Sequence, residues 1–144
     1  MRRFSFGFGL ACVIVALAAC SGNPMPGDRD YPYNLSGDYD VSFEAMGTEY
    51  AGPATLSTSP GGMLYGVLDL EGPERVAGNI EGSITGDTLT FDSNYERGGG
   101  CQGVLSGQGR ITEGGDAVAG VAVVDDDCTG DLFDSIFTFT RKSE

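Results

Sequence analysis

Seven clusters of turn-forming residues divide the chain from residue 46 onward into segments of similar length. The clusters recur at intervals of roughly 12 to 16 residues. They are Met46-Gly47, Ser59-Pro60-Gly61-Gly62, Gly72-Pro73-Glu74, Thr85-Gly86-Asp87, Gly98-Gly99-Gly100, Glu113-Gly114-Gly115-Asp116 and Cys128-Thr129-Gly130-Asp131. Pro60-Gly61 suits the centre of a type II turn, and Gly86-Asp87 suits a two-residue type II′ hairpin. Seven turns predict eight consecutive strands, and no interval shows helical periodicity.

Between the turns, apolar and polar residues alternate with a period of two. From residue 37 to 46, the apolar face carries Tyr39, Val41, Phe43 and Ala45, and the polar face carries Asp38, Asp40, Ser42 and Glu44. The same alternation places on one face Leu64, Leu68 and Leu70, then Ile80 and Ile84, then Leu89 and Phe91, and finally Phe137 and Phe139. This pattern is typical of antiparallel strands with one face on a core and the other in water.

Several glycines fall inside the expected strands, namely Gly66, Gly78, Gly82, Gly107, Gly109 and Gly120. Glycine inside a strand marks a bulge or a sharp bend, which a sheet needs when it closes on itself. The pattern therefore predicts an all-β fold, a single eight-stranded antiparallel up-and-down β-barrel, with a two-sheet β-sandwich as the alternative. The outward face must carry most of the acidic residues, so we expect a soluble barrel and not a transmembrane one.

The first twenty residues read as an export signal. Arg2 and Arg3 precede an apolar run that ends at Ala19 and is too short to span a bilayer. The run closes on Leu17-Ala18-Ala19-Cys20, which resembles the lipobox of bacterial lipoproteins. The resemblance implies that residues 1–19 are a signal peptide and that Cys20 becomes a lipid-modified N-terminus. An ordinary signal peptide with an incidental Cys20 is the alternative.

Residues 20–34 are expected to be a flexible tether, and residues 35–144 the barrel domain. Gly, Pro and Asp dominate from Ser21 to Asn34, a composition that cannot bury apolar area. In the sorting logic of the lipoprotein family, Ser21 after the cysteine favours the outer membrane over the inner one. We therefore expect a lipid-anchored protein of the cell envelope, on the periplasmic face of the outer membrane or at the surface.

The chain is strongly acidic. Its formal net charge is −13, and loss of Arg2 and Arg3 with the signal peptide would make it −15. Such a surface repels nucleic acids and anionic headgroups, so membrane attachment would depend on the lipid. The acidity otherwise suits solubility or docking to a basic envelope protein, and the sequence leaves the oligomeric state open.

Two cysteines remain in the processed chain once Cys20 is assigned to the lipid. Cys101 and Cys128 form an even pair in a compartment where disulfides persist, and we expect them to be bridged. A redox pair or a thiolate metal site is the alternative. The spacing is not C-x-x-C, and the chain has no His to complete a zinc set.

The two ends of the domain resemble the calycin-like small barrels. Leu35-Ser36-Gly37-Asp38-Tyr39 is similar to the Gly-x-Trp opening of lipocalins and of barrel-type periplasmic protease inhibitors, with Tyr39 in place of Trp. Phe137-Thr138-Phe139-Thr140-Arg141 is similar to their closing strand, and the resemblance implies that Arg141 packs on Tyr39. The segment from Gly78 to Ile84 also resembles the barrel domains of transferrin-binding surface lipoproteins, whose closing Gly-rich motif is missing here.

Catalysis finds little support in the residue types present. Without His, a Ser-His-Asp or Cys-His arrangement is impossible, and the only Lys is Lys142 near the C-terminus. Acidic residues are so numerous that no single carboxylate pair points to a glycosidase. We therefore expect a protein that is not an enzyme and needs no cofactor.

One acidic cluster is a weak candidate for calcium. Its candidate ligands are Asp125, Asp127 and Asp131, and Asp125, Asp127, Thr129 and Gly130 match the first half of an EF-hand loop. The twelfth position would be Ile136, which offers no carboxylate. A solvated turn is the alternative, and we expect no bound metal.

Three functions from different classes remain. The first is a non-catalytic binding or interaction module of the envelope, the second a carrier of a small apolar ligand in the barrel mouth, and the third a hydrolase inhibitor. For the first, Tyr95 and Arg97 beside Cys101 are expected to form a partner-binding loop surface, because aromatic residues and Arg are enriched at interface hot spots. Bulky inward residues argue for a filled interior, whereas the strand glycines argue for free volume beside the rings.

Overall fold

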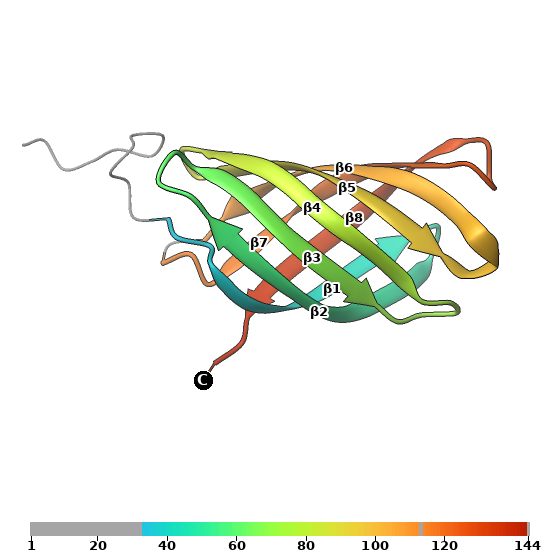
Figure 1. Ribbon diagram of the computed structural model, residues 1–144, viewed down its shortest axis with the longest axis horizontal. Coiled ribbons are helices and arrows are strands. Elements are labelled where there is room, and N and C mark those ends of the chain that lie inside the picture. Colours follow the sequence, from blue (N-terminus) through green and yellow to red (C-terminus); the bar gives the residue numbers. More distant parts are fainter. Residues whose placement is uncertain (1–32, 113, 144) are drawn as a thin grey trace, which may run out of the picture.

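The computed structural model describes residues 33–112 and 114–143, and these residues form a closed barrel (Figure 1). The strands are β1 (Gly37–Ala45), β2 (Thr48–Thr58), β3 (Met63–Leu70), β4 (Val76–Thr85), β5 (Thr88–Arg97), β6 (Cys101–Ile111), β7 (Ala117–Asp126) and β8 (Leu132–Arg141). Each strand pairs antiparallel with the next, and β8 returns to β1 from Tyr39↔Arg141 to Ala45↔Ser135. The predicted eight-stranded up-and-down barrel is confirmed, and the sandwich is excluded.

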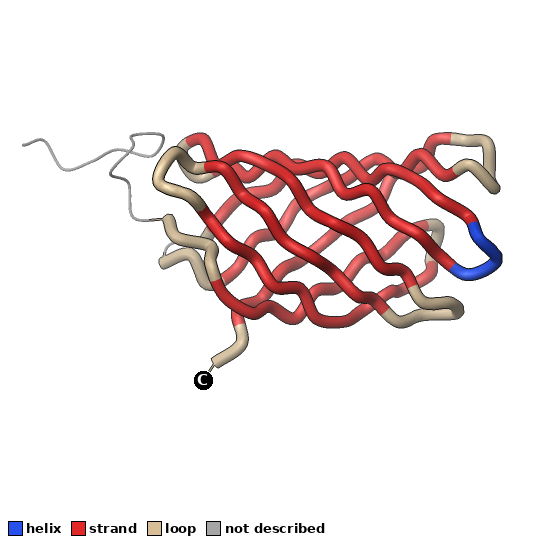
Figure 2. Tube along the Cα trace, in the orientation of Figure 1, coloured by secondary structure: helices blue, strands red, loops and turns tan. Residues whose placement is uncertain are grey.

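Helix is almost absent from the described residues. The short 3-10 turn η1 (Gly98–Gly100) joins β5 to β6 and is the blue segment at one end of the barrel in Figure 2. Nothing in the described ranges forms a helix with the length and apolar character needed to cross a membrane.

All seven predicted turns connect consecutive strands, but one has a different geometry from the one expected. At Ser59–Gly62 the positive φ, +77°, belongs to Gly62 and not to Gly61, so the turn is not type II. The N–H of Gly62 donates to the carbonyl of Ser59 at 3.0 Å. The two-residue loop at Gly86-Asp87 has its positive φ of 65° at Gly86, as a type II′ turn requires.

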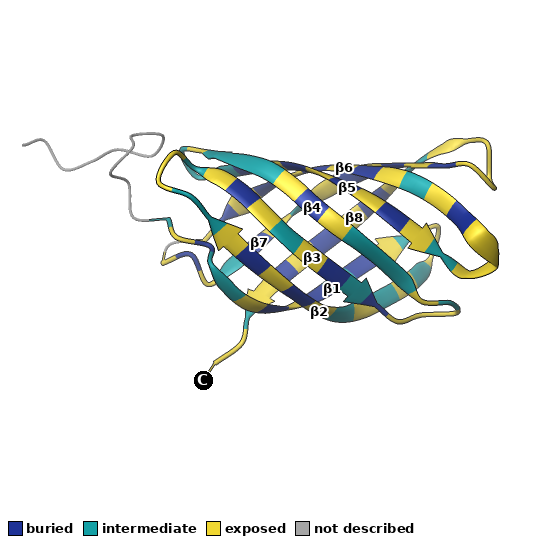
Figure 3. Cartoon of the chain, viewed as in Figure 1, coloured by how far each residue is buried: buried dark blue, intermediate teal, exposed yellow. Residues whose placement is uncertain are grey.

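The period of two in the sequence becomes the alternation between core and surface (Figure 3). Of the predicted apolar face, all members are buried except Ala45 and Ile84, which are partly exposed. The complete inward rows add residues from β2, β6 and β7, namely Ala54, Leu56, Leu105, Ile111, Val118, Ala122 and Val124.

Aromatic rings fill the middle of the barrel. The Phe91 ring meets the Phe137 ring edge to face at 5.2 Å between centroids, and Phe139 lies 5.5 Å from Phe137. A Cβ atom added to Gly107 would lie 2.5 Å from the Phe91 ring, so this glycine makes room for the ring. The volume that strand glycines leave beside the rings is therefore occupied by protein here, and it does not form a ligand cavity.

One end of the barrel is closed by the two ends of the domain. The Arg141 guanidinium lies 5.0 Å from the centroid of the Tyr39 ring, which confirms the contact implied by the calycin resemblance. The same guanidinium donates to the carbonyls of Ser36 and Asn34, each at 2.7 Å. Leu35, which is fully buried, is thereby held across this end.

Candidate functional site

The opposite end of the barrel, formed by the β1–β2, β3–β4, β5–β6 and β7–β8 connections, is open. A cavity of about 270 Å³ lies there. Its lining is mostly apolar and comes from all eight strands or the turns beside them: Phe43, Ala45, Met46, Thr48, Tyr50, Leu70, Val76, Tyr95, Arg97, Leu105, Val124, Asp126, Thr129, Phe133 and Ser135. A concave apolar site with a few convergent polar groups is the usual form of a small-molecule site.

The polar groups of this cavity sit where two inward rows reach the open end. Along β5, the row that contains Leu89 and Phe91 continues through Tyr95 to Arg97, the last residue of the strand. Along β7, the row that contains Val124 ends on Asp126. Because the inward rows are mostly apolar further down, these side chains meet at the boundary between core and solvent.

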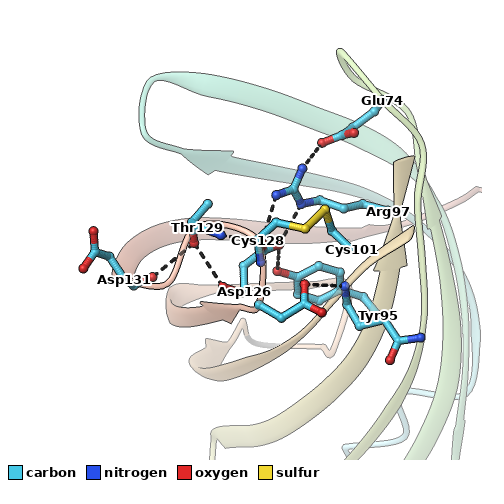
Figure 4. A network of polar contacts seen from close by, with 10 residues as sticks. Glu74, Tyr95, Arg97, Cys101, Asp126, Cys128, Thr129 and Asp131 are labelled. Atoms are coloured by element: carbon cyan, nitrogen blue, oxygen red, sulfur yellow. Dashed lines mark hydrogen bonds and ion pairs between the residues drawn. A yellow bond between two sulfur atoms is a disulfide. The ribbon is translucent and has the colours of Figure 1, made fainter. Parts of the chain in front are cut away.

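Asp126 is the centre of a dense hydrogen-bond network (Figure 4). Arg97 donates to it through Nε at 2.6 Å and through a terminal nitrogen at 2.8 Å, and the Tyr95 hydroxyl donates at 2.8 Å. The backbone N–H groups of Cys128 and Thr129 donate to the same carboxylate at 3.0 and 3.2 Å. The remaining terminal nitrogen of Arg97 pairs with Glu74 of the β3–β4 connection.

This network shifts the ionisation of its members. Hydrogen bonds from Arg97, and secondarily from Tyr95 and the Cys128 backbone, hold the pKa of Asp126 well below its usual range despite 1% side-chain exposure. Burial, together with the hydrogen bond to Asp126, raises the pKa of Tyr95 above its usual value. Asp126 is therefore an anion and Tyr95 a neutral donor at neutral pH.

The predicted disulfide is present and lies over this network. Cys101 begins β6, Cys128 lies in the β7–β8 turn, and their Cα atoms are 5.7 Å apart. The bridge joins the turn that supplies two N–H donors to Asp126 to the strand that follows Arg97. It therefore holds the β7–β8 turn at the mouth.

Tyr95 and Arg97 lie elsewhere than on the loop surface expected from sequence. Tyr95 is only 7% exposed and points inward, and the Arg97 side chain is 20% exposed and held by two carboxylates. They come together with Cys101 as expected, but they line the cavity and do not project as a contact surface. The physical reason is that side chains alternate in direction along a strand, and both residues belong to the inward row of β5.

The calcium candidates do not converge. Asp125 points outward from β7, and Asp127 accepts the N–H of Gln102 at 2.9 Å. In the described residues, the group with metal-ligand spacing joins Asp126 and Asp127 to the two cysteines, whose sulfur atoms are already bonded to each other. Asp131 is exposed and outside that group. Cys20, the predicted lipidation site, lies outside the described residues.

A larger depression of about 920 Å³ lies on the outer wall. Outward side chains of β2 to β7 border it, many of them polar, such as Asn79, Asn94 and Gln102. It is wider and shallower than the mouth cavity. The mouth cavity is less open and more apolar than this depression, so it is the stronger candidate for a small ligand.

The fold and the cavity define this protein as an up-and-down β-barrel with one closed and one open end. Among solved structures, the chain is similar to EF1p2_mFAP2b bound to DFHBI, with a TM-score of 0.64, 19% identity, and coverage of 75% of this chain and 94% of that chain. It is also similar to a redesigned beta barrel, mFAP1, bound to DFHBI, with a TM-score of 0.62, 17% identity, and coverage of 74% and 94%. At such identities the likeness shows the fold alone. No family model and no curated protein matches the chain.

Proposed function

We propose that this protein is a non-catalytic binding module, tethered to the envelope by lipid on Cys20, that holds a small and largely apolar ligand in its open mouth. The observation that carries the proposal is the 270 Å³ cavity, whose walls are mostly apolar and whose polar groups gather at one edge. Two structurally similar barrels are bound to DFHBI, which supports binding as a use of this architecture.

The position of the cavity suits a tethered binder. The Asn34 carbonyl accepts a hydrogen bond from Arg141 at the closed end, so the described chain begins at the end opposite the mouth. Thirteen peptide steps from Cys20 to Tyr33 reach at most about 45 Å, which keeps the barrel near the bilayer. The mouth could then face away from the membrane.

The structure gives the hydrolase-inhibitor alternative no specific support. That alternative needs the tether or a loop as its inserting element, and all of the tether before Tyr33 lies outside the described residues. The ligand-binding proposal instead uses Tyr95 and Arg97 where they lie, in the lining of the mouth cavity.

Filling the cavity tests this proposal. Binding of the neutral fluorescent probe N-phenyl-1-naphthylamine is measured for the wild type and for Val124→Phe, which projects a ring into the mouth. Val123→Phe is the matched control, because Val123 is the preceding residue of β7 and points outward with 42% exposure.

We expect the wild type and Val123→Phe to bind the probe and Val124→Phe to lose most of the binding, with thermal midpoints compared for all three. Where Val124→Phe does not fold, Thr48→Phe at the other side of the mouth replaces it. No probe binding by the wild type, or equal binding by all folded variants, would contradict the proposal.

A further inference from the structure

The polar edge of the mouth cavity is negative once Glu74, just outside the lining, is counted. Arg97 is the one cation and Asp126 the one carboxylate among the lining residues, and Arg97 pairs with both Asp126 and Glu74. Asp126 is saturated, because two nitrogens of Arg97, the Tyr95 hydroxyl and two backbone N–H groups already donate to it. One positive charge therefore faces two negative ones.

Glu74 is the carboxylate that can still accept a hydrogen bond from a ligand. Its side chain is 29% exposed, so it reaches solvent at the rim while the Asp126 side chain does not. Its Oε1 accepts from Arg97, whereas Oε2, beside Gly98, receives no hydrogen bond from the described residues. A donor group on a ligand could pair with this oxygen without displacing Arg97.

The surrounding connections reinforce this charge. The four connections of the open end and the strand residues that flank them contain Glu71, Glu74, Asp126, Asp127 and Asp131 against Arg75 and Arg97. Five carboxylates against two arginines give this end of the described barrel a local charge of −3, which attracts cations and repels anions.

The walls are compatible with the same kind of ligand. Phe43, Tyr50 and Phe133 line the cavity, and aromatic faces attract cations as well as alkyl groups. A fatty acid would bring its carboxylate next to Glu74 in a partly desolvated site, where like charges repel strongly.

We infer that the mouth binds amphiphilic monocations, with an alkyl or aryl part in the cavity and an ammonium group beside Glu74 at the rim. This inference rests on the proposed function and adds the chemical class of the ligand. The cavity is the site, and the charge selects what enters it.

Three ten-carbon probes with different head groups test the inference. Decylamine, decanol and decanoate compete with N-phenyl-1-naphthylamine for the wild type at neutral pH and low salt. We expect decylamine to bind about tenfold more tightly than decanoate, with decanol between them, because a unit charge near Glu74 contributes with opposite sign in the two ions. The difference should shrink as sodium chloride is raised to about 0.5 M.

Two variants assign the preference to the rim carboxylate. Glu74→Gln keeps an oxygen acceptor for Arg97 but removes the charge, and it should reduce the preference for decylamine over decanol roughly threefold. Glu81→Gln makes the same change at an exposed position on the outer face of β4, outside the open-end connections, and should leave the preference nearly unchanged. Decylamine binding should also be lost in Val124→Phe, as expected for a ligand inside the mouth.

The possible outcomes separate this inference from the proposed function. Probe binding that depends on Val124, together with decanoate binding as tight as decylamine, would overturn the charge preference and leave the proposed function intact. Decylamine binding that persists in Val124→Phe would show adsorption to the acidic surface and would overturn the inference. Failure of every probe, N-phenyl-1-naphthylamine included, would overturn both.

Discussion

At the scale of single residues, two buried serines differ only in whether their hydroxyls are satisfied. Ser93 on β5 is 1% exposed, and its hydroxyl finds no partner among the described residues. Ser135 on β8 is 4% exposed, and its hydroxyl donates to the carbonyl of Ala122 at 3.2 Å. An unsatisfied buried hydroxyl costs about 1–3 kcal/mol, whereas a satisfied one stabilises by roughly 1 kcal/mol.

Alanine at these two positions should therefore change stability in opposite directions. We expect Ser93→Ala to raise the free energy of unfolding by about 1 kcal/mol and Ser135→Ala to lower it by a similar amount. Urea unfolding followed by circular dichroism measures both values. Destabilisation of similar size by both substitutions would contradict this account of Ser93.

Asp126 makes stability depend on pH. Its folded pKa is depressed, so the unfolded chain takes up a proton first as the pH falls. The stabilisation is complete above the ordinary Asp pKa of about 3.9 and is lost progressively as the pH falls from there through the lower folded pKa. We expect Asp126→Asn to be about 3 kcal/mol less stable than wild type at pH 7, near the low end for a broken buried pair because Glu74 still faces Arg97.

Unfolding free energies measured from pH 7 to pH 2 check this assignment. Between pH 4 and pH 2 the wild type should lose stability more steeply than Asp126→Asn, and the two curves should approach each other. Parallel curves across this range would show that Asp126 is not the titrating group.

The position of Asp126 was readable from sequence, but its role was not. The alternation along β7 places Asp126 on the inward row after Ala122 and Val124, and it places Asp125 and Asp127 on the outward row. Instead, the outward carboxylates Asp125 and Asp127 were predicted as calcium ligands, because they belong to an acidic run. The contact between Arg97 and Glu74 could not be predicted, because it depends on the conformation of the β3–β4 connection beside the end of β5.

At the scale of elements, the turn clusters predicted all eight strands and their connections, and the alternation predicted the inward face of every strand except β2, β6 and β7. These signals are local, since each turn needs particular backbone angles and each strand needs one apolar face. The prediction of a type II turn at Ser59–Gly62 was wrong. A Pro-Gly pair fits more than one turn geometry, and here the neighbouring Gly62 takes the positive φ. Similarly, Gly107 could be read as a site of free volume until the position of the Phe91 ring was known.

The disulfide stabilises the element that closes around the polar network. Cys101 and Cys128 enclose the β6–β7 hairpin, and a separation of 27 residues gives a stabilisation of roughly 3–4 kcal/mol in the chain-entropy model. We expect Cys101→Ser/Cys128→Ser to lower the unfolding free energy by this amount in urea titrations. Wild-type protein under dithiothreitol should match the variant, and a reductant effect on the variant itself would point to another cause.

At the scale of the whole molecule, the mouth cavity emerges only when the sheet closes. Its lining combines residues from β1 to β8 that are far apart in sequence, such as Phe43, Leu105 and Phe133. Whether their side chains meet or leave space depends on the tilt and diameter of the barrel, which no local pattern determines. The sequence could therefore predict the barrel and leave open whether its interior is filled, and the structure shows a filled middle with a hollow open end.

The proposed role of the whole molecule depends on its attachment to the membrane through Cys20. The full chain has a net charge of −13 and the mouth is acidic, so anionic lipid headgroups would repel the protein, and the proposed attachment depends on a covalent lipid. Growth with radiolabelled palmitate should label the wild type at the mature size, and Cys20→Ser should abolish the label and leave the protein unprocessed or released. Cys12→Ser, a cysteine within the same apolar run, is the matched control and should be labelled like the wild type. Label that persists in Cys20→Ser would move the anchor elsewhere, and with it the expectation that the mouth faces away from the bilayer.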